Sequence, residues 1–196
     1  MQNIRQKLET FDVSELWHIT HWENIKNIFN LGILNHYDAY ERVHNVKNIS
    51  DPGAQRWRNN IEPIYNRKIH DYAPLYIHPY NPMFYVRREI INELCLVEVS
   101  LDVLVEGNFL ISDGNAASKD TRFSNSIDFL DDLSWDCIYA KYWKGYEDGK
   151  RKKCAEILVY PSIEPNYIED VYCYSEKTEQ KLFSQGYNAK ILIEPF

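Results

Sequence analysis

Several patterns that mark common functions are missing from this sequence. Its four cysteines, Cys95, Cys137, Cys154 and Cys173, are widely spaced, with no CxxC pair and no Cys/His cluster at the spacing of a zinc site. Neither a phosphate-binding P-loop nor a GxGxxG fingerprint is present, which excludes the two commonest nucleotide-binding folds. We therefore expect free, mostly buried thiols and no metal site.

Long apolar runs are missing as well. No run approaches the roughly 18 apolar residues that a membrane-spanning helix needs, and residues 1–5 lack the apolar core of a secretory signal. The 196 residues include only 7 Gly and 8 Pro, and 44% of them are hydrophobic. This composition is typical of an ordered globular fold. We expect one domain over residues 1–196, in a reducing cytoplasm and without a membrane partner.

Positively charged residues are fewer than negatively charged ones, with 22 Lys and Arg against 29 Asp and Glu. The formal net charge of −7 repels a polyanion at long range, so a nucleic acid would have to be held by a local basic patch. One candidate patch is a cluster before residue 155, which a solvated charged turn explains equally well. The 15 Tyr and 5 Trp could stack on bases, or simply fill a Tyr-rich core and surface. The cluster consists of Lys141, Lys144, Lys150, Arg151, Lys152 and Lys153.

The most unusual stretch is residues 155–160, a short apolar and partly β-branched segment interrupted by one carboxylate. In a strand, Glu156 lies on the same face as Cys154, Leu158 and Tyr160. The side chain then points either to solvent near the start of the strand or into a cleft. An exposed Glu beside four basic residues is the ordinary interpretation. Other segments of the chain favour the cleft.

Strands and short helices alternate without βαβ regularity, which predicts an α+β fold around an irregular, mostly antiparallel sheet. Residues 20–23 form a capping box, and residues 35–50 have no clear period and are expected to be a long loop. Pro74 indicates an edge or irregular strand. Strands are predicted over 14–20, 70–77, 93–100, 109–112, 155–160, 168–174 and 190–194, and helices over 24–31, 51–58, 81–88, 126–133, 134–143 and 175–186.

Two short segments carry polar residues suited to a ligand. His18 and Thr20 share one strand face just before a helix N-terminus, whose unpaired N–H groups suit a diphosphate or a network of ribose hydroxyls. A hydrogen-bonded core histidine and a plain helix cap are the alternatives. Gln55 and Arg58 lie on one face of the helix that follows Asp51, because they are three residues apart.

Six motifs, taken in order, resemble those of the DarT family, the DNA ADP-ribosyltransferase toxins of bacterial toxin–antitoxin pairs. The resemblance covers residues 17 to about 174, most of the chain. The motifs are Trp17-His-Ile-Thr-His21, Gln55-Arg-Trp-Arg58, His70-Asp-Tyr-Ala-Pro-Leu-Tyr76, Asn81-Pro-Met83, Asp113-Gly-Asn-Ala116 and Lys153-Cys-Ala-Glu156-Ile-Leu-Val159.

The resemblance implies an ADP-ribosyltransferase fold that binds NAD as co-substrate and transfers ADP-ribose to a thymine or guanine base of single-stranded DNA. It implies a macrodomain-type antitoxin as a possible partner. By position, Glu156 corresponds to the catalytic glutamate, and Arg58 to an NAD-contacting arginine that is also proposed as the base. His18, Ile19 and Thr20 match the segment holding the nicotinamide half of NAD, with Asn24 and Asn27 on the adenosine side. The implied DNA contacts are Met83, Lys119, Asp120, Thr121, Arg122 and Lys153.

Relatives often have a histidine where Asp120 stands and an arginine where Tyr80 stands. Both departures lie on the expected DNA side, so base choice and sequence context are the properties that the resemblance predicts least.

The residue types fit the implied chemistry. Cleavage between nicotinamide and ribose develops an oxocarbenium cation, which a carboxylate such as Glu156 stabilises. Because a guanidinium holds its proton tightly, Arg58 is better suited to orienting NAD than to accepting a proton. Two other functions stay open: transfer to RNA or protein, and an inactive module that only binds NAD or nucleic acid.

Overall fold

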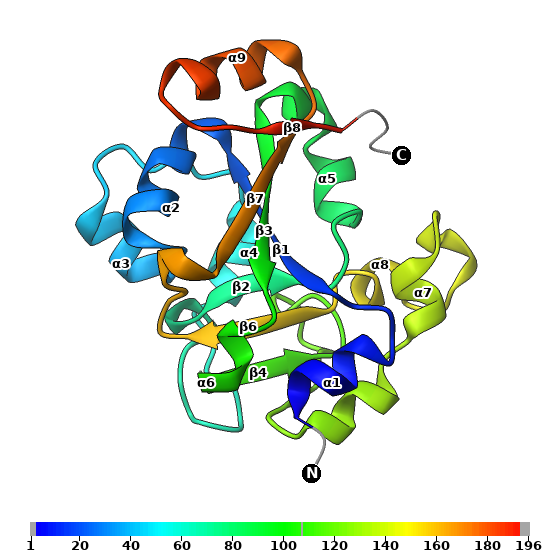
Figure 1. Ribbon diagram of the computed structural model, residues 1–196. Coiled ribbons are helices and arrows are strands. Elements are labelled where there is room, and N and C mark those ends of the chain that lie inside the picture. The colour runs from blue at the N-terminus through cyan, green and yellow to red at the C-terminus, as the bar shows by residue number, and fades with distance from the viewer. Residues whose placement is uncertain (1–2, 107, 193–196) are drawn as a thin grey trace.

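The computed structural model describes residues 3–106 and 108–192, and its strands form one eight-stranded sheet (Figure 1). The strands are β1 (Glu15–His21), β2 (Ala73–Tyr76), β3 (Leu94–Ser100), β4 (Asn108–Ser112), β5 (Phe123–Ser124), β6 (Glu156–Tyr160), β7 (Ile168–Cys173) and β8 (Lys190–Ile191). The helices are α1 (Ile4–Glu9), α2 (Ile25–Leu31), α3 (His36–Arg42), α4 (Pro52–Trp57), α5 (Pro82–Val86), α6 (Val103–Glu106), α7 (Trp135–Tyr139), α8 (Gly149–Lys152) and α9 (Glu176–Ser184).

The strand order is β5-β4-β6-β2-β1-β3-β7-β8, and every pairing except β7 with β8 is antiparallel. The predicted α+β class with a mostly antiparallel sheet is therefore confirmed. Most neighbours share long registers, such as the seven residue pairs between β1 and β3. By contrast, the register of β1 with β2 contains the single pair Trp17 and Tyr76. We call this junction the seam.

Pro74 explains why the seam is thinly paired. It lies in β2, opposite Leu158 of β6, and has no N–H to donate toward β1. Its carbonyl oxygen lies 3.0 Å from Nδ1 of His18, so a side chain takes a position that a backbone donor would occupy. The prediction of an edge strand was wrong, because β2 is central; the alternative of an irregular strand holds.

The helix predictions were mostly right, with two corrections. Residues 35–50 were expected to be a loop, but α3 occupies 36–42, capped by the Asn35 side chain, which accepts from the Asp38 N–H at 3.0 Å. Thr20 does not cap the following turn, because it still belongs to β1. His21 caps it instead, and its Nδ1 accepts from the N–H of Glu23 at 3.2 Å. The predicted strand over 190–194 is seen at 190–191, and residues 193–194 lie outside the described part.

The main hydrophobic core joins the sheet to α1, α2 and α9, with fully buried Leu8, Leu16, Ile25, Ile157 and Leu182. In Figure 1, α2 and α3 lie to one side of the long strands, and α5, α7 and α8 to the other. All four cysteines are free and buried, as expected. Within residues 3–106 and 108–192, none of the helices has the length and apolar character needed to cross a membrane.

Candidate active site

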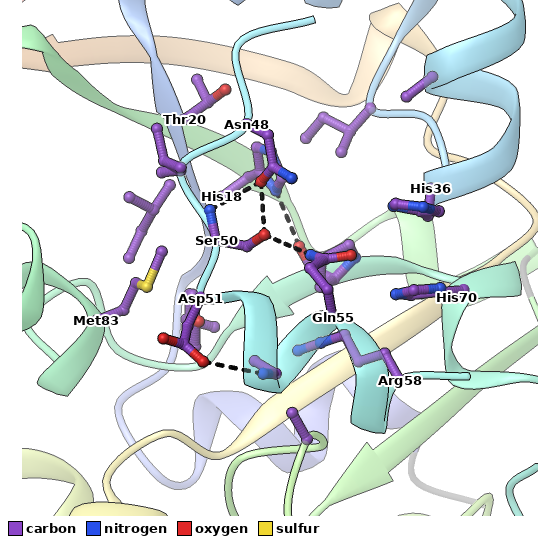
Figure 2. A pocket seen from close by; sticks show the side chains of 18 of the residues that line it. His18, Thr20, His36, Asn48, Ser50, Asp51, Gln55, Arg58, His70 and Met83 are labelled. Carbon is purple, nitrogen blue, oxygen red and sulfur yellow. Dashed lines mark hydrogen bonds between the residues drawn. The ribbon is translucent and has the colours of Figure 1, made fainter. Parts of the chain in front are cut away.

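A large cavity of about 740 Å³ lies beside the seam, within the size range of small-molecule sites (Figure 2). Residues from β1, α2, α3, α4, β2 and α5 form its wall. Figure 2 shows His18, Thr20 and Met83 along one side, and His36, His70 and Arg58 along the other. Of the residues predicted to hold NAD or DNA, the wall includes His18, Ile19, Thr20, Asn24, Asn27, Arg58 and Met83.

His18 presents a neutral imidazole to this cavity. Burial lowers the pKa of His18, and the nearby charge of Arg58 lowers it further, against the hydrogen bond with the carbonyl of Pro74. With the ring neutral and Nδ1 donating to that carbonyl, Nε2 is left as an acceptor. His18 is therefore oriented by the same proline that interrupts the seam.

Asn24 makes hydrogen bonds to the segment between α3 and α4, which lines the cavity. Its side-chain amide donates to the carbonyl of Lys47 at 2.9 Å and accepts from the N–H of Lys47 at 3.0 Å. The same amide donates to Oγ1 of Thr20 at 3.0 Å. Asn24 thus links β1, the start of α2 and the segment that follows α3. Asn27, one turn further along α2, also lines the cavity.

The chain between α3 and α4 continues this wall through short polar contacts (Figure 2). Gln55 donates to Oγ of Ser50 at 2.5 Å, and Ser50 donates to Asn48 at 2.5 Å. Asp51 caps α4 by accepting from Gly53 at 2.8 Å, as the Asp-Pro pattern predicted. The wall opposite β1 is therefore held in place by several side-chain hydrogen bonds.

Glu156 and Arg58 form a buried ion pair. The Arg58 Nη2 donates to Oε2 of Glu156 at 2.5 Å, with the Glu156 side chain fully buried and that of Arg58 13% exposed. Burial acts to lower the pKa of Arg58, but the charge and hydrogen bond of Glu156, together with Tyr76 and Cys154, outweigh it and raise the pKa overall. Two residues that sequence reasoning assigned to one site are thus brought into direct contact.

The second carboxylate oxygen of Glu156 is held by the backbone. The N–H of Ala116 donates to Oε1 of Glu156 at 3.0 Å. Ser112, opposite Glu156 on β4, accepts from the Glu156 N–H at 3.1 Å and donates to the carbonyl of Gly114 at 2.7 Å. Sequence reasoning missed the role of Ala116 because a backbone donor leaves no trace in residue type, although the Asp113-Gly-Asn-Ala116 motif contains it.

Arg58 separates Glu156 from the cavity. Arg58 lines the wall, whereas Glu156 does not. Tyr76, paired with Glu156 across β2 and β6, also lines the wall, and burial followed by the charge of Glu156 raises the pKa of Tyr76 well above its usual value. In this conformation the wall of the cavity therefore presents Arg58 and Tyr76 and not the carboxylate of Glu156.

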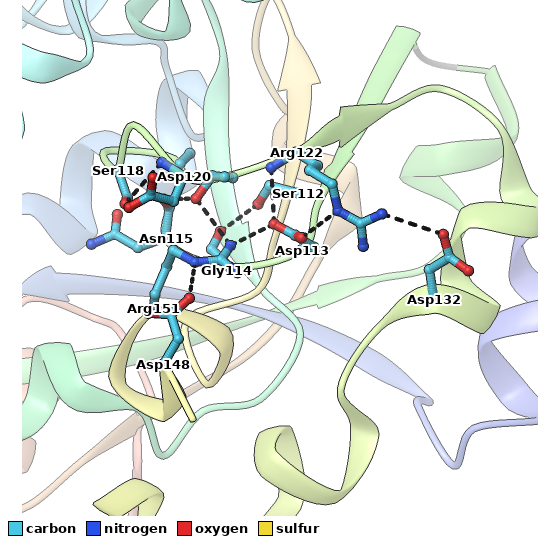
Figure 3. A network of polar contacts seen from close by, with 12 residues as sticks. Ser112, Asp113, Gly114, Asn115, Ser118, Asp120, Arg122, Asp132, Asp148 and Arg151 are labelled. Atoms are coloured by element: carbon cyan, nitrogen blue, oxygen red, sulfur yellow. Dashed lines mark hydrogen bonds and ion pairs between the residues drawn. The ribbon is translucent and has the colours of Figure 1, made fainter. Parts of the chain in front are cut away.

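Paired charges fix the base of the loop at residues 115–122 (Figure 3). Asp113 accepts from Nε of Arg122 at 2.9 Å and from Nη1 of Arg151 at 2.5 Å, and these bonds outweigh burial to lower the pKa of Asp113. Thr121 donates to the carbonyl of Asn115 at 2.6 Å. Asn115, Ala117 and Ser118 line the cavity, whereas the predicted contacts Lys119, Asp120, Thr121 and Arg122 lie beyond its wall.

The basic cluster before β6 is divided by the fold. Lys153 is only 3% exposed and donates to the carbonyl of Ile138 at 2.8 Å, so its predicted contact with DNA has no support in this conformation. Arg151 pairs with Asp113 and with Asp148. Lys150 is exposed and lines the cavity. The patch is smaller than the sequence indicated.

Comparisons with known proteins identify the family of this chain. Residues 17–195 match the family model described as "ssDNA thymidine ADP-ribosyltransferase, DarT". A curated relative, the DNA ADP-ribosyl transferase-DNA ADP-ribosyl glycohydrolase fusion protein of Thermosipho africanus, is 30% identical over 185 residues. That match covers 92% of this chain but 48% of the fusion, so the chain spans about half the length of this relative.

Two solved structures of DarT from Thermus sp. 2.9 share the fold. The complex with ADP-ribosylated single-stranded DNA superposes with a TM-score of 0.82 at 22% identity, covering 94% of this chain and 97% of the other. The complex with NAD+ gives a TM-score of 0.77 at 21% identity and covers 94% and 98%. Since the family model matches nearly the whole chain, the resemblance seen in the sequence is confirmed, and this chain belongs to the DarT family of single-stranded-DNA ADP-ribosyltransferases.

Proposed function

We propose that this protein transfers ADP-ribose from NAD to a thymine base of single-stranded DNA and releases nicotinamide. The observation that carries the proposal is the buried Glu156–Arg58 pair at the wall of a cavity lined by His18 and Thr20. The family description and the NAD+ and DNA complexes of the Thermus DarT support NAD and DNA as substrates. The family description also favours thymine over guanine.

In the proposed reaction, Glu156 accepts a hydrogen bond from the 2′-hydroxyl of the nicotinamide ribose. Its negative charge stabilises the oxocarbenium cation that forms as nicotinamide leaves. His18, Ile19 and Thr20 hold the nicotinamide half, and Asn24 and Asn27 lie toward the adenosine half. Arg58 moves from Glu156 to the ribose or the diphosphate when the carboxylate takes up its own ligand.

We assign Arg58 to orientation and charge rather than to proton transfer. The charge of Glu156 raises the pKa of Arg58, so the guanidinium keeps its proton more tightly than a free arginine does. When the base attacks the anomeric carbon, its proton passes to the carboxylate of Glu156, because the guanidinium of Arg58 has no free lone pair to accept it. The bond from the ribose to nicotinamide breaks, and the bond from the ribose to the nucleobase forms.

We place the DNA strand between α5 and the 115–122 loop. Met83 and Asn115 line the cavity from these two elements, and Lys119 and Arg122 are exposed on the loop beyond it. Lys150 adds a positive charge at the wall of the cavity. Because the net charge is −7, we expect a short contact with few phosphates rather than a long binding track.

We further propose a partner that removes the modification. The Thermosipho relative is named as a fusion of a transferase with a DNA ADP-ribosyl glycohydrolase. A separate or fused enzyme of that class, a macrodomain-type antitoxin, would reverse the reaction of this chain.

The test is to incubate the protein with NAD and oligonucleotides of matched length that contain either thymine or guanine as the acceptor. We expect one added ADP-ribose per modified thymine by mass spectrometry, together with released nicotinamide. RNA of the same sequence and a protein mixture serve as competing acceptors. Transfer to guanine alone would refute the base assignment, and transfer only to RNA or protein would refute the proposal as a whole.

A further inference from the structure

His70 is the least satisfied polar side chain at the cavity. The residue is 4% exposed, yet among residues 3–106 and 108–192 neither Nδ1 nor Nε2 has a hydrogen-bond partner. Buried polar atoms are nearly always paired in folded proteins, and unpaired ones therefore call for a specific explanation. His70 lines the cavity, so a bound molecule could supply the missing partner.

Aromatic neighbours fix the orientation of this ring. The imidazole of His36 stacks on it at 4.0 Å with an angle of 14° between the planes (Figure 2). The ring of Tyr37 contacts it edge-on at 5.8 Å. The His36 ring comes from α3, which covers the cavity, whereas His70 belongs to the turn before β2. The nitrogens of His70 are therefore held in place before any ligand arrives.

The position of His70 is tied to the reacting groups. Its backbone N–H donates to the carbonyl of Arg58 at 3.0 Å, and the Arg58 side chain contacts Glu156. In the proposed reaction, a ribose of NAD lies against this pair. A ribose bound there would bring its hydroxyls close to the turn that carries His70.

The imidazole is uncharged at neutral pH. Burial, then the charges of His36, Arg58 and Lys68, lower the pKa of His70 to about 4. A neutral ring offers one N–H donor and one nitrogen acceptor, which suits a group that can both donate and accept. A phosphate only accepts at neutral pH and favours a cation, whereas a ribose hydroxyl does both.

We propose that His70 hydrogen-bonds a ribose hydroxyl of NAD and so helps to position the sugar at Glu156. This inference rests on the proposed use of NAD and adds a binding residue to it. His36 holds the ring by stacking and makes no hydrogen bond to it.

The test replaces His70 with phenylalanine, which keeps a ring for His36 to stack on and removes both nitrogens. We expect the dissociation constant for NAD, measured by calorimetry, to rise about tenfold, as for one lost hydrogen bond. The melting temperature without NAD should stay the same or rise, because two unpaired buried nitrogens are removed. The matched control is Tyr37→Phe, which removes a polar group beside His70 outside the cavity wall and should leave NAD affinity within twofold.

Deoxy analogues of NAD identify the group that is bound. Wild-type protein should bind the analogue that lacks the contacted ribose hydroxyl about tenfold more weakly than NAD, whereas His70→Phe should bind the two alike. Equal NAD affinity of wild type and His70→Phe would overturn the inference and leave the proposed function intact. Full discrimination between analogues by His70→Phe would also overturn it. Failure of the wild type to bind NAD at all would overturn both proposals.

Discussion

Glu156 is a charged residue that the fold removes entirely from solvent. A buried carboxylate is strongly unfavourable unless it is paired and hydrogen-bonded, and here one oxygen contacts Arg58 and the other the N–H of Ala116. Because both carboxylate oxygens have partners, the ion pair is stable in the protein without a ligand. In the proposed reaction, the contact with Arg58 must loosen before Glu156 can contact a sugar.

Replacing Glu156 with glutamine tests the charge while keeping the shape. The amide oxygen can still accept from Ala116, but Arg58 loses its counter-charge. We expect ADP-ribose transfer to fall on the order of 10²–10³-fold or more, and the free energy of unfolding to fall by about 3 kcal/mol. Transfer is followed by nicotinamide release, and stability by denaturant unfolding.

Glu98→Gln is the matched control for this substitution. Glu98 lies on β3 and accepts from the hydroxyl of Tyr172 at 2.6 Å, away from the cavity wall. Its replacement should leave transfer close to the wild-type rate. A Glu156→Gln protein that transfers ADP-ribose at the wild-type rate would show that the carboxylate is not required.

At the scale of elements, α3 is the clearest failure of sequence reasoning. Its spaced residues His36, Ala39 and Tyr40 fall on one helical face, but that face lines the cavity instead of the core. A stripe of mixed aromatic and small residues has no clear hydrophobic period, so the sequence predicts a loop there instead of a helix. The Asn35 cap was the available signal, because Asn followed three residues later by Asp38 is a common way to begin a helix.

The hydrogen bonds between Asn24 and Lys47 predict that a substitution of Asn24 weakens the binding of NAD. Asn24→Ala removes the two hydrogen bonds to the Lys47 backbone and the one to Thr20, so the segment after α3 should loosen. We expect the KM for NAD to rise roughly fivefold with little change in kcat. Steady-state kinetics of nicotinamide release measure both constants.

Asn30→Ala, an exposed position on the same helix, should leave both constants unchanged. A fall in kcat without a change in KM for Asn24→Ala would show that Asn24 does not act by holding the segment between α3 and α4 in place.

The Asp113 network predicts that the 115–122 loop depends on charge. Asp113→Asn weakens the ion pairs to Arg122 and Arg151, and the loop carrying the Ala116 N–H should become more mobile. We expect faster hydrogen exchange over residues 115–122 and about tenfold slower transfer to DNA. Asp132→Asn, which removes an exposed pairing to Arg122, is the control. Unchanged exchange in the loop would argue against the network as its anchor.

For the molecule as a whole, the sequence predicts features that depend on neighbouring residues, but it does not predict which distant segments come into contact. Strand β6, the Asp51 and Asn81 helix starts and the six ordered motifs could all be recognised because each depends on neighbouring residues. Sequence could not reveal that Arg58 covers Glu156, or that Lys153 is turned inward to Ile138, because these depend on which segments meet. Pro74 predicts an edge or irregular strand, and the edge alternative is wrong because β2 is central.

Buried neutral histidines make stability depend on pH. Burial is the main cause that lowers the pKa of both His70 and His78 to about 4, with His36, Arg58 and Lys68 adding to it for His70 and Lys153 for His78. Between pH 4 and about 6.5 the unfolded chain binds protons that the native protein excludes. The contribution of these two histidines to stability is therefore fully present above pH 6.5 and is lost as the pH falls toward 4.

We expect the free energy of unfolding to decrease from pH 7 to pH 5, and to decrease less steeply in His70→Phe. The slopes should differ by at most about 1.4 kcal/mol per pH unit, the value for one proton. Denaturant titrations at pH 5, 6 and 7 measure these slopes. Parallel slopes for the two proteins would mean that His70 is protonated in the native state as easily as in the unfolded chain.

The seam has a consequence for how the molecule responds to its ligand. The strands on one side of it carry His18 and Thr20, and those on the other carry Tyr76 and Glu156. With a single register pair between β1 and β2, little backbone bonding joins the two halves of the sheet there. A dinucleotide bound to both halves would link them non-covalently. Its binding free energy would therefore also stabilise the association of the two halves of the sheet at the seam.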